Sequence, residues 1–353
     1  MRCPLLSELP PPQCDKTGWP WTEESARLPD QMPDGRAWPR ITIVTPSYNQ
    51  RRFLEETIRS VLLQGYPNLE YVIIDGCSTD GSIELIQKYV AWLRYWVSEP
   101  DRGQAHAINK GFALATGDLL GWINSDDLYL PSSLRMLGEA HSLYPRAILA
   151  GDVENFHDGE DSLTLVRQSN LTLRNLVDPW NGLWSGHQPG WFAPRLLHLT
   201  VGPLDESLRY AFDRDWLCRL LQRADMEYLG QPVARFRIHA TAKTTAEVPA
   251  AIREVLLVAQ RYWHDVPDLD KQYVCAIHGL QEASVYLGDH PSYARFWNRR
   301  KAIDLLFSTW CEYPRIALTR AFWKLCLRAV LPRWVLLFRR AVESKFAFHQ
   351  FRG

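Results

Sequence analysis

The chain has 353 residues, which is too long for one typical hydrophobic core and fits a large domain joined to a smaller one. Hydrophobic residues make up 46% and charged residues 23%, as in ordinary globular proteins, and no run of 18 apolar residues predicts a transmembrane helix. The formal charge is zero, yet residues 294–353 hold 13 basic and 3 acidic side chains, so this segment carries +10 and the rest of the chain −10.

Cysteine usage and the first residues indicate a compartment. The seven cysteines are odd in number and scattered, without a CxxC pair or a Cys/His zinc spacing, which favours a reduced chain. Near the N-terminus, Pro10-Pro11-Pro12 stands where a signal peptide needs apolar residues. We therefore expect a cytoplasmic protein, either free or peripheral on the inner face of the cell membrane.

The first predicted elements form one supersecondary unit. Residues 1–38 are rich in proline and lack hydrophobic periodicity, so we expect an extended arm. A β-branched run predicts a strand over 41–44, followed by a helix over 53–62 that ends at Gly65 and by a second strand over 71–74. This spacing suits a βαβ unit, whose strands are parallel and buried on both faces.

The same alternation continues along the chain. We predict a helix over 82–95, a short strand over 95–97, a helix over 105–115 and a buried strand over 119–123. Alternating strands and helices indicate an open α/β sheet. Ligands of such sheets bind beyond the carboxyl ends of the strands, and three of the predicted strands end here in polar residues.

The composition changes in the last third of the chain. Glycine becomes scarce, and helical patterns rich in Leu, Trp, Tyr and Arg are broken at Pro267, Pro314 and Pro332. After the arm, we therefore predict an α/β domain over 39–245 and a helical, basic C-terminal region over 246–353.

Acidic side chains follow two of the predicted strands. Asp126 and Asp127 are adjacent, and like charges repel unless a cation such as Mg²⁺ or Mn²⁺ lies near them. Asp127 could instead cap a helix that begins near Pro131. Asp75, in a turn rich in Gly and Ser, could accept hydrogen bonds from a ribose or a base, or be an ordinary turn residue.

Several motifs in series resemble the family 2 glycosyltransferases, which have the GT-A fold: TPSYNQRRFLEETIRSVLLQ, IIDGCSTDGS and EPDRGQAHAINKGFALATGDLLGWINSDDLYLP. The resemblance extends from about Arg40 to Thr245. It implies an open, mainly parallel sheet flanked by helices, with a helical C-terminal extension. It also implies Mn²⁺- or Mg²⁺-dependent transfer of a sugar, with inversion, from a nucleoside-diphosphate donor (a UDP-sugar is favoured) to a saccharide or lipid-linked saccharide. Cell-surface polysaccharide or glycolipid synthesis is the expected setting.

The resemblance assigns roles on the donor side. Asn124-Ser125-Asp126 occupies the DxD position of the family, with asparagine in place of the first aspartate. Asp126 would be the main metal ligand, His239 would reach back to the metal or the diphosphate, and Asn124 and Ser125 would face the donor. The other residues that the resemblance places near the nucleotide or donor are Pro46, Tyr48, Asp75, Arg102 and Asn109.

Some of these residues also have simpler interpretations. Arg102 could form a surface ion pair with Asp101 or Glu99, and Asn109 could belong to the polar face of a helix. His239 could be bonded to backbone at a strand end.

The segment RYAFDRDWLCRLL resembles the acidic motif that supplies the catalytic base. An ionised carboxylate can take the proton of the acceptor hydroxyl, and the motif register favours Asp213, with Asp215 as the rival. Upstream, WSGHQPGWFAP resembles the acceptor-side segment. It makes His187, Gln188 and Trp191 candidates for sugar contact, although aromatic residues are often simply buried.

Residues 315–345 combine basic and apolar side chains. Arg320, Lys324 and Arg328 recur at every fourth position beside Trp, Leu and Phe, a pattern that suits an anionic membrane surface. The alternative is a helical appendage packed on the domain with a solvated basic face. We expect no nucleic-acid partner, because the segment has no recognisable binding module.

Two other function classes fit less well. A nucleotidyltransferase would need a Gly-rich phosphate loop after the first strand, and TPSYNQ is not one. An inactive, membrane-associated assembly partner would be compatible with Asn124, but the retained Asp126 and Asp213 argue against it.

Overall fold

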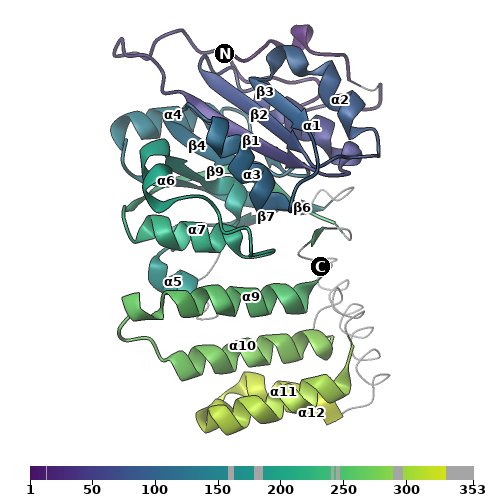
Figure 1. Ribbon diagram of the computed structural model, residues 1–353, viewed down its shortest axis with the longest axis vertical. Helices are drawn as coiled ribbons and strands as arrows, with labels where there is room; N and C mark the ends of the chain where they lie inside the picture. The colour runs from purple at the N-terminus through teal and green to yellow at the C-terminus, as the bar shows by residue number, and fades with distance from the viewer. Residues whose placement is uncertain are drawn as a thin grey trace, which may run out of the picture. The chain divides into compact units, whose positions relative to one another are not determined.

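The computed structural model divides the chain into two compact units, Met1–Ala242 and Lys243–Gly353 (Figure 1). It describes residues 1–12, 14–157, 163–178, 186–239, 242–243, 247–288 and 297–330.

The first unit is built on a mixed sheet with the strand order β3-β2-β1-β4-β8-β6-β9-β5, and β7 pairs with β6. Its parallel half consists of β1 (Ile41–Ser47), β2 (Leu69–Asp75), β3 (Tyr95–Ser98) and β4 (Leu119–Trp122). β1 and β2 are buried along their whole length, as expected for central parallel strands covered on both faces. The predicted open α/β sheet is confirmed.

The second half of the sheet is mixed. It contains β5 (Leu128–Tyr129), β6 (Ile148–His157), β7 (Leu163–Val166), β8 (Trp191–Pro194) and β9 (Met226–Ile238). β8 runs antiparallel to both β4 and β6 and so joins the two halves, whereas β6 and β9 are parallel. The sequence analysis predicted none of these five strands. β5 has only two residues, and β6 and β9 each contain a glycine near which their pairing is irregular, so neither shows a regular alternation.

Helices flank this sheet (Figure 1). They are α1 (Arg51–Leu62), α2 (Ser82–Lys88), α3 (Gln104–Leu114), α4 (Ser133–Leu143), α5 (Leu173–Val177), α6 (Arg195–Val201) and α7 (Phe212–Leu221). The helix predicted over 82–95 ends earlier than expected, at Lys88. Tyr89 leaves helical geometry (φ −106°, ψ 2°), buries its ring and donates its hydroxyl to Glu55, and a 3-10 turn, η2 (Val90–Trp92), follows.

The N-terminal arm is fastened to the domain by a buried arginine. Arg59 of α1 is 0% exposed, and its guanidinium donates to the carbonyls of Pro10, Pro20 and Trp21 at 2.9–3.0 Å. Burying an arginine is costly unless its donors find acceptors. Regular structure is limited among the described residues of the arm, to the 3-10 turn η1 (Leu6–Glu8) and an isolated bridge between Gln31 and Ala37. Carbonyls of this irregular segment are therefore what satisfies Arg59.

The second unit is helical as far as the structure describes it. It contains α9 (Val248–Arg261), α10 (Lys271–Tyr286), α11 (Arg299–Glu312) and α12 (Arg320–Val330), with 3-10 turns η4 (Trp263–Asp265) and η6 (Pro314–Leu318). Pro267 and Pro314 fall between helices as predicted, and Pro332 lies outside the described residues. Among the described helices, none is long and apolar enough to cross a membrane.

Candidate functional site

The carboxyl ends of β1, β2 and β4 meet at one edge of the sheet. Ser47 is paired in register with Asp75, and Val44 with Trp122. We call the segments that follow these strands, residues 47–50, 75–78 and 122–127, the strand-end site. Its position is the one where open α/β sheets bind ligands.

Asp75 is the last residue of β2 and is wholly buried. Its carboxylate accepts hydrogen bonds from Ser78 N (2.9 Å), Ser78 Oγ (2.5 Å) and Ser98 Oγ (2.7 Å). A carboxylate has about four acceptor positions. Three are therefore filled by the protein, and one is left for a ligand donor such as a base N–H.

Tyr48 lies beside the turn that follows Asp75. A Cβ on Gly76 would approach Tyr48 Cδ2 to 3.4 Å and Asp101 Oδ2 to 2.6 Å, so only glycine fits between them. Tyr48 is 62% exposed and presents its ring to solvent, where a planar base could stack on it. Pro46 is different, because it is buried within β1 and paired with Ile74.

The loop after β4 is held by a network of polar side chains. Asn124 accepts from Gln104 Nε2 (2.6 Å) and donates to Asp127 Oδ2 (3.0 Å). Ser125 is buried, and Asp126 Oδ2 lies 3.0 Å from His239 Nε2. Asparagine can donate to Asp127, which a first aspartate of a DxD motif could not do. The departure at this position therefore has a local structural reason.

Asp127 does not cap a helix, and that interpretation is wrong. The helix α4 has Ser132 as its N-cap, without a side-chain cap. Asp127 instead accepts from the backbone N–H of Arg237 (3.0 Å) and, through its own carbonyl, from Thr57 (2.7 Å). Burial and then the neighbouring charge of Asp126 raise the pKa of Asp127 well above its ordinary value.

Arg237 of β9 lies behind this loop. Its guanidinium is placed between the rings of Phe53 and Phe156, at 4.7 and 4.5 Å from their centroids. It pairs with Glu56 at 2.7 Å and donates to the carbonyl of Asp126 at 2.8 Å. Arg237 thus positions the loop that carries Asp126.

Arg102 and Asn109 converge on Glu206, a residue that the sequence analysis missed. Arg102 donates to Glu206 Oε2 from Nε (3.1 Å) and Nη2 (2.5 Å), so its partner is neither Asp101 nor Glu99. Asn109 donates to Glu206 Oε1 and exchanges two hydrogen bonds with the backbone of Leu204. The protein itself uses the amide of Asn109, which indicates a loop-fixing role. No sequence spacing connects these residues, which lie about a hundred positions apart.

Two buried polar atoms at this edge lack a hydrogen-bond partner in the described part of the chain, Ser47 Oγ and Gln188 Oε1. Gln188 belongs to a 3-10 turn, η3 (Gln188–Gly190), and donates from Nε2 to the carbonyl of Trp122 at 2.8 Å. That bond sets the amide orientation, since its oxygen would repel a carbonyl. A buried polar atom without a partner costs about 1–3 kcal/mol, so both atoms are candidates for ligand contact.

Of the other two acceptor-side candidates, His187 is half-buried and Trp191 is fully buried. His187 stacks on Phe236 with ring centroids 4.5 Å apart, and burial lowers its pKa to about 4. Trp191 is only 1% exposed, and its Nε1 donates to Gln168. This burial argues against the expected stacking of a sugar on Trp191.

Asp213 and Asp215 occupy the first turn of α7. The preceding residue, Phe212, packs its ring 6.4 Å from that of Trp122, which brings the start of α7 to the carboxyl end of β4. Asp213 is half-buried there. Asp215 is 3% exposed and pairs with Arg219 at 2.9 Å. Arg219 in turn donates to the carbonyls of Val201, at the end of α6, and of Pro203 in the loop that follows, so Asp215 has a structural role.

Asp126 and His239 are the residues that could hold a divalent cation. Their 3.0 Å separation is about that of neighbouring ligands around an octahedral ion with bonds of about 2.1 Å. Among the described residues, no cluster of three or more His, Cys, Asp or Glu forms a complete metal site. Mg²⁺ commonly takes one or two protein carboxylates and completes its shell with water and substrate phosphates. The pair fits such an ion.

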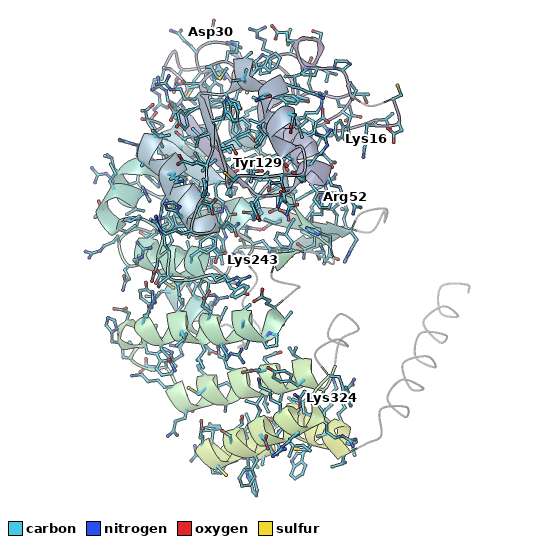
Figure 2. All side chains as sticks on the ribbon, turned by 45° about the vertical axis from the view of Figure 1, so that its right-hand side comes forward. Lys16, Asp30, Arg52, Tyr129, Lys243 and Lys324 are labelled. Atoms are coloured by element: carbon cyan, nitrogen blue, oxygen red, sulfur yellow. The ribbon has the colours of Figure 1, made fainter. Side chains whose placement is uncertain are left out.

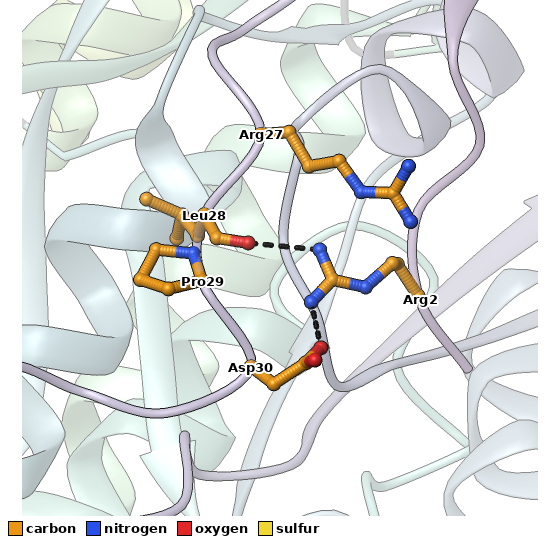
Figure 3. Close-up of a pocket in the computed structure, with 5 residues that line it drawn as sticks. All are labelled: Arg2, Arg27, Leu28, Pro29 and Asp30. Atoms are coloured by element: carbon orange, nitrogen blue, oxygen red, sulfur yellow. Dashed lines mark hydrogen bonds and ion pairs between the residues drawn. The ribbon is translucent and has the colours of Figure 1, made fainter. Parts of the chain in front are cut away.

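A separate pocket lies in the N-terminal arm (Figure 3), lined by Arg2, Arg27, Leu28, Pro29 and Asp30. Arg2 donates to the carbonyl of Leu28 at 2.8 Å and pairs with Asp30. Leu28 N donates to the carbonyl of Gly65, just before β2, so this pocket lies at the amino end of the strands. It belongs to the contacts that hold the arm, at the edge opposite the strand-end site.

The sheet and its flanking helices define a class of protein, that of the GT-A fold. The crystal structure of Staphylococcus aureus TarS 1-349 in complex with UDP-GlcNAc superposes with a TM-score of 0.54 over 78% of this chain and 82% of that chain. At 16% sequence identity, this likeness concerns the fold alone.

The family follows from the sequence comparison. Residues 42–195 match the family described as Glycosyl transferase family 2. The teichuronic acid biosynthesis glycosyltransferase TuaG of Bacillus subtilis, a provisional assignment, is 36% identical over 104 residues, which are 27% of this chain and 39% of TuaG. An uncharacterized glycosyltransferase of Rickettsia typhi is 26% identical over 59% of this chain and 66% of its own length. The chain thus spans less than two thirds of these relatives, and its N-terminal domain is similar to glycosyltransferase family 2 over residues 42–195.

Proposed function

We propose that the strand-end site binds a nucleoside-diphosphate sugar, with UDP as the favoured nucleotide, and that the domain transfers the sugar to a hydroxyl acceptor. The observation that carries the proposal is the convergence of three features at one edge of the sheet. They are the exposed ring of Tyr48, the one acceptor position that remains on the Asp75 carboxylate, and the Asp126–His239 pair. The complexes of TarS with UDP-GlcNAc and with UDP support the choice of nucleotide.

The nucleotide would be held by groups suited to its parts. Tyr48 would stack on the base and Asp75 would accept from a base N–H through its remaining acceptor position. Asp126 and His239 would hold Mn²⁺ or Mg²⁺, and the cation, when bound, would neutralise charge that develops on the leaving diphosphate. Arg237 would keep Asp126 in place through the backbone carbonyl that it binds.

Asp213 would act as the general base. The acceptor oxygen attacks the anomeric carbon from the face opposite the diphosphate, the bond between that carbon and the diphosphate oxygen breaks, and the acceptor proton passes to the Asp213 carboxylate. Attack from the opposite face inverts the anomeric configuration. Asp215 is less suited to this role because Arg219 already holds it.

The acceptor side is proposed to include Gln188, whose Oε1 could accept from a sugar hydroxyl. A saccharide or a lipid-linked saccharide of cell-surface polysaccharide synthesis is the proposed acceptor. The teichuronic acid assignment of the B. subtilis relative supports this class.

The proposal is tested by incubating the purified protein with UDP-, GDP-, dTDP- and CMP-linked sugars, with Mn²⁺ or EDTA, and measuring release of the free nucleotide. We expect slow release from one class of UDP-sugar only with the metal, and faster release with a polysaccharide acceptor. Nucleotide binding without any release would favour an inactive partner. Release of pyrophosphate from UTP and a sugar phosphate would instead show a nucleotidyltransferase.

A further inference from the structure

The helices α11 and α12 expose an unusual number of large apolar side chains. They and the turn between them account for seven of the nineteen exposed large hydrophobic residues in the described part of the chain, although they span only residues 299–330. We call these seven the α11/α12 surface: Ile303, Phe307, Trp310, Leu318, Trp323, Leu327 and Val330.

The two helices form their hydrophobic core without these residues. Both helices already bury another face, through Ala302 and Leu306 on α11 and through Phe322, Leu325 and Ala329 on α12. The exposed residues form second stripes at positions i, i+4 and i+7: 303, 307 and 310 on α11, and 323, 327 and 330 on α12. Each helix is therefore apolar on two sides, and the described residues of the unit cover only one of these sides.

Basic side chains adjoin the exposed stripe of α12. Arg320, Lys324 and Arg328 recur at every fourth position and form a row next to Trp323 and Leu327, and Figure 2 labels Lys324 on this helix. Over residues 297–330 there are seven basic and two acidic side chains. Trp323 is 60% exposed although its Nε1 already donates to the carbonyl of Ala317, so it presents an apolar ring.

We propose that the α11/α12 surface attaches the protein to an anionic lipid membrane. A row of Trp, Phe and Leu next to a row of Arg and Lys is what an interfacial helix needs, with apolar groups among the acyl chains and basic groups at the phosphates. A symmetric contact between two copies of this chain is disfavoured, because the same basic row would meet itself. The proposal does not depend on the proposed sugar transfer.

The test uses the full chain and two double variants, Phe307→Ser with Leu327→Ser and Arg320→Glu with Lys324→Glu. Co-sedimentation is measured with neutral phosphatidylcholine vesicles and with vesicles containing about 30 mol% phosphatidylglycerol. We expect binding to the anionic vesicles only, a loss at about 0.5 M salt, and a decrease of about tenfold or more in each double variant. Matched controls in the first unit are Leu196→Ser, at a residue 75% exposed, and Lys88→Glu, and both should bind as the unmodified protein does.

Three outcomes would overturn the proposal. The first is equal binding to neutral vesicles, or none to either kind. The second is undiminished binding of both double variants, which would move the contact to another segment. The third is a dimer, seen by analytical ultracentrifugation, that the same variants dissociate. Thermal stabilisation by UDP is measured on the same variants to separate failure of this proposal from failure of the proposed function. The stabilisation should be the same in the variants and the unmodified protein, whether or not they bind lipid.

Discussion

The two ends of the parallel strands carry polar side chains of similar kinds but use them differently. At the amino end, Glu70 of β2 accepts from Thr42 Oγ1 and from the N–H and hydroxyl of Thr116, each at 2.7 Å. Burial alone would raise the pKa of Glu70, but these hydrogen bonds lower it below its ordinary value. The protein completes this polar cluster itself.

At the carboxyl end, the corresponding groups are left incomplete. Ser47 Oγ and Gln188 Oε1 are buried without a partner among the described residues, and Asp126 Oδ2 lies 3.0 Å from His239 Nε2, a pair that could hold a cation. Unused acceptors are costly in a folded protein, so they persist where a ligand supplies the missing partner. The comparison therefore separates the polar groups that stabilise the fold from those that are expected to bind.

The largest expected effect is on catalysis. Asp213→Asn should lower the rate of sugar transfer by about 10²- to 10⁴-fold, because no carboxylate then takes the proton of the attacking hydroxyl. UDP binding should stay unchanged. Asp215→Asn should instead lower thermal stability, since Arg219 loses its charged partner. Steady-state rates and melting curves of both variants check this, and full activity of Asp213→Asn would exclude it as the base.

Replacing Asn124 with the aspartate typical of the family motif should be harmful here. Asn124→Asp loses the hydrogen bond to Asp127 and adds a third carboxylate, so we expect the free energy of unfolding to fall by about 1–3 kcal/mol without metal. The amino-end comparison is Asn68→Asp, which also loses an amide hydrogen bond, to the carbonyl of Trp38, but places its new charge beside Arg40 and should cost less. Denaturant unfolding measures both, and equal stability of Asn124→Asp and the unmodified protein would contradict the explanation.

The half-buried His187, packed on Phe236, should make the fold sensitive to acid. Its pKa is about 4 in the folded protein and about 6.5 in the unfolded chain, so only the unfolded chain binds the proton between these values, and stability falls as the pH drops from 6.5 to 4. His187→Phe keeps the stacking on Phe236 but has no imidazole to protonate. Its free energy of unfolding, relative to that of the unmodified protein, should therefore be about 2 kcal/mol higher at pH 5 than at pH 8. Unfolding at both pH values, with the exposed His264→Gln as control, tests this, and a pH-independent difference would refute it.

The smallest expected effects, those of removing one hydroxyl at each end of β1, distinguish the ligand-binding end of the strands from the structural end. Ser47→Ala removes a hydroxyl that has no hydrogen-bond partner among the described residues, so stability should be unchanged or slightly higher while UDP affinity falls up to about tenfold. Thr42→Val removes a hydroxyl that donates to Glu70 and accepts from Gly117 N, and it should cost about 1–3 kcal/mol without changing UDP affinity. Calorimetric titration and melting curves measure both, and the opposite pattern would remove the distinction.

The sequence predicted the parallel half of the sheet well, because long apolar runs alternating with periodic helices give strong local signals. It placed Asp75 and Asp126 at strand ends for the same reason. It could not show that Asp127 bonds to β9, since Arg237 lies 110 residues away. Nor could it separate the buried Trp191 from an exposed aromatic, because both look alike in a motif. Glu206 and Gln104 carry no pattern of their own and became visible only through their contacts.

The central claim is that the strand-end site binds a nucleoside diphosphate together with a divalent cation. The most direct measurement is the melting temperature of the protein with UDP, in Mn²⁺ or in EDTA, for the unmodified chain, Asp126→Ala and the surface control Glu139→Gln. At about a hundred times the dissociation constant, UDP should add about 2.7 kcal/mol of stability, a shift of a few degrees, only with Mn²⁺ and only in the unmodified chain and the control. A shift that persists in EDTA or in Asp126→Ala, or no shift with UDP at all, would contradict the claim.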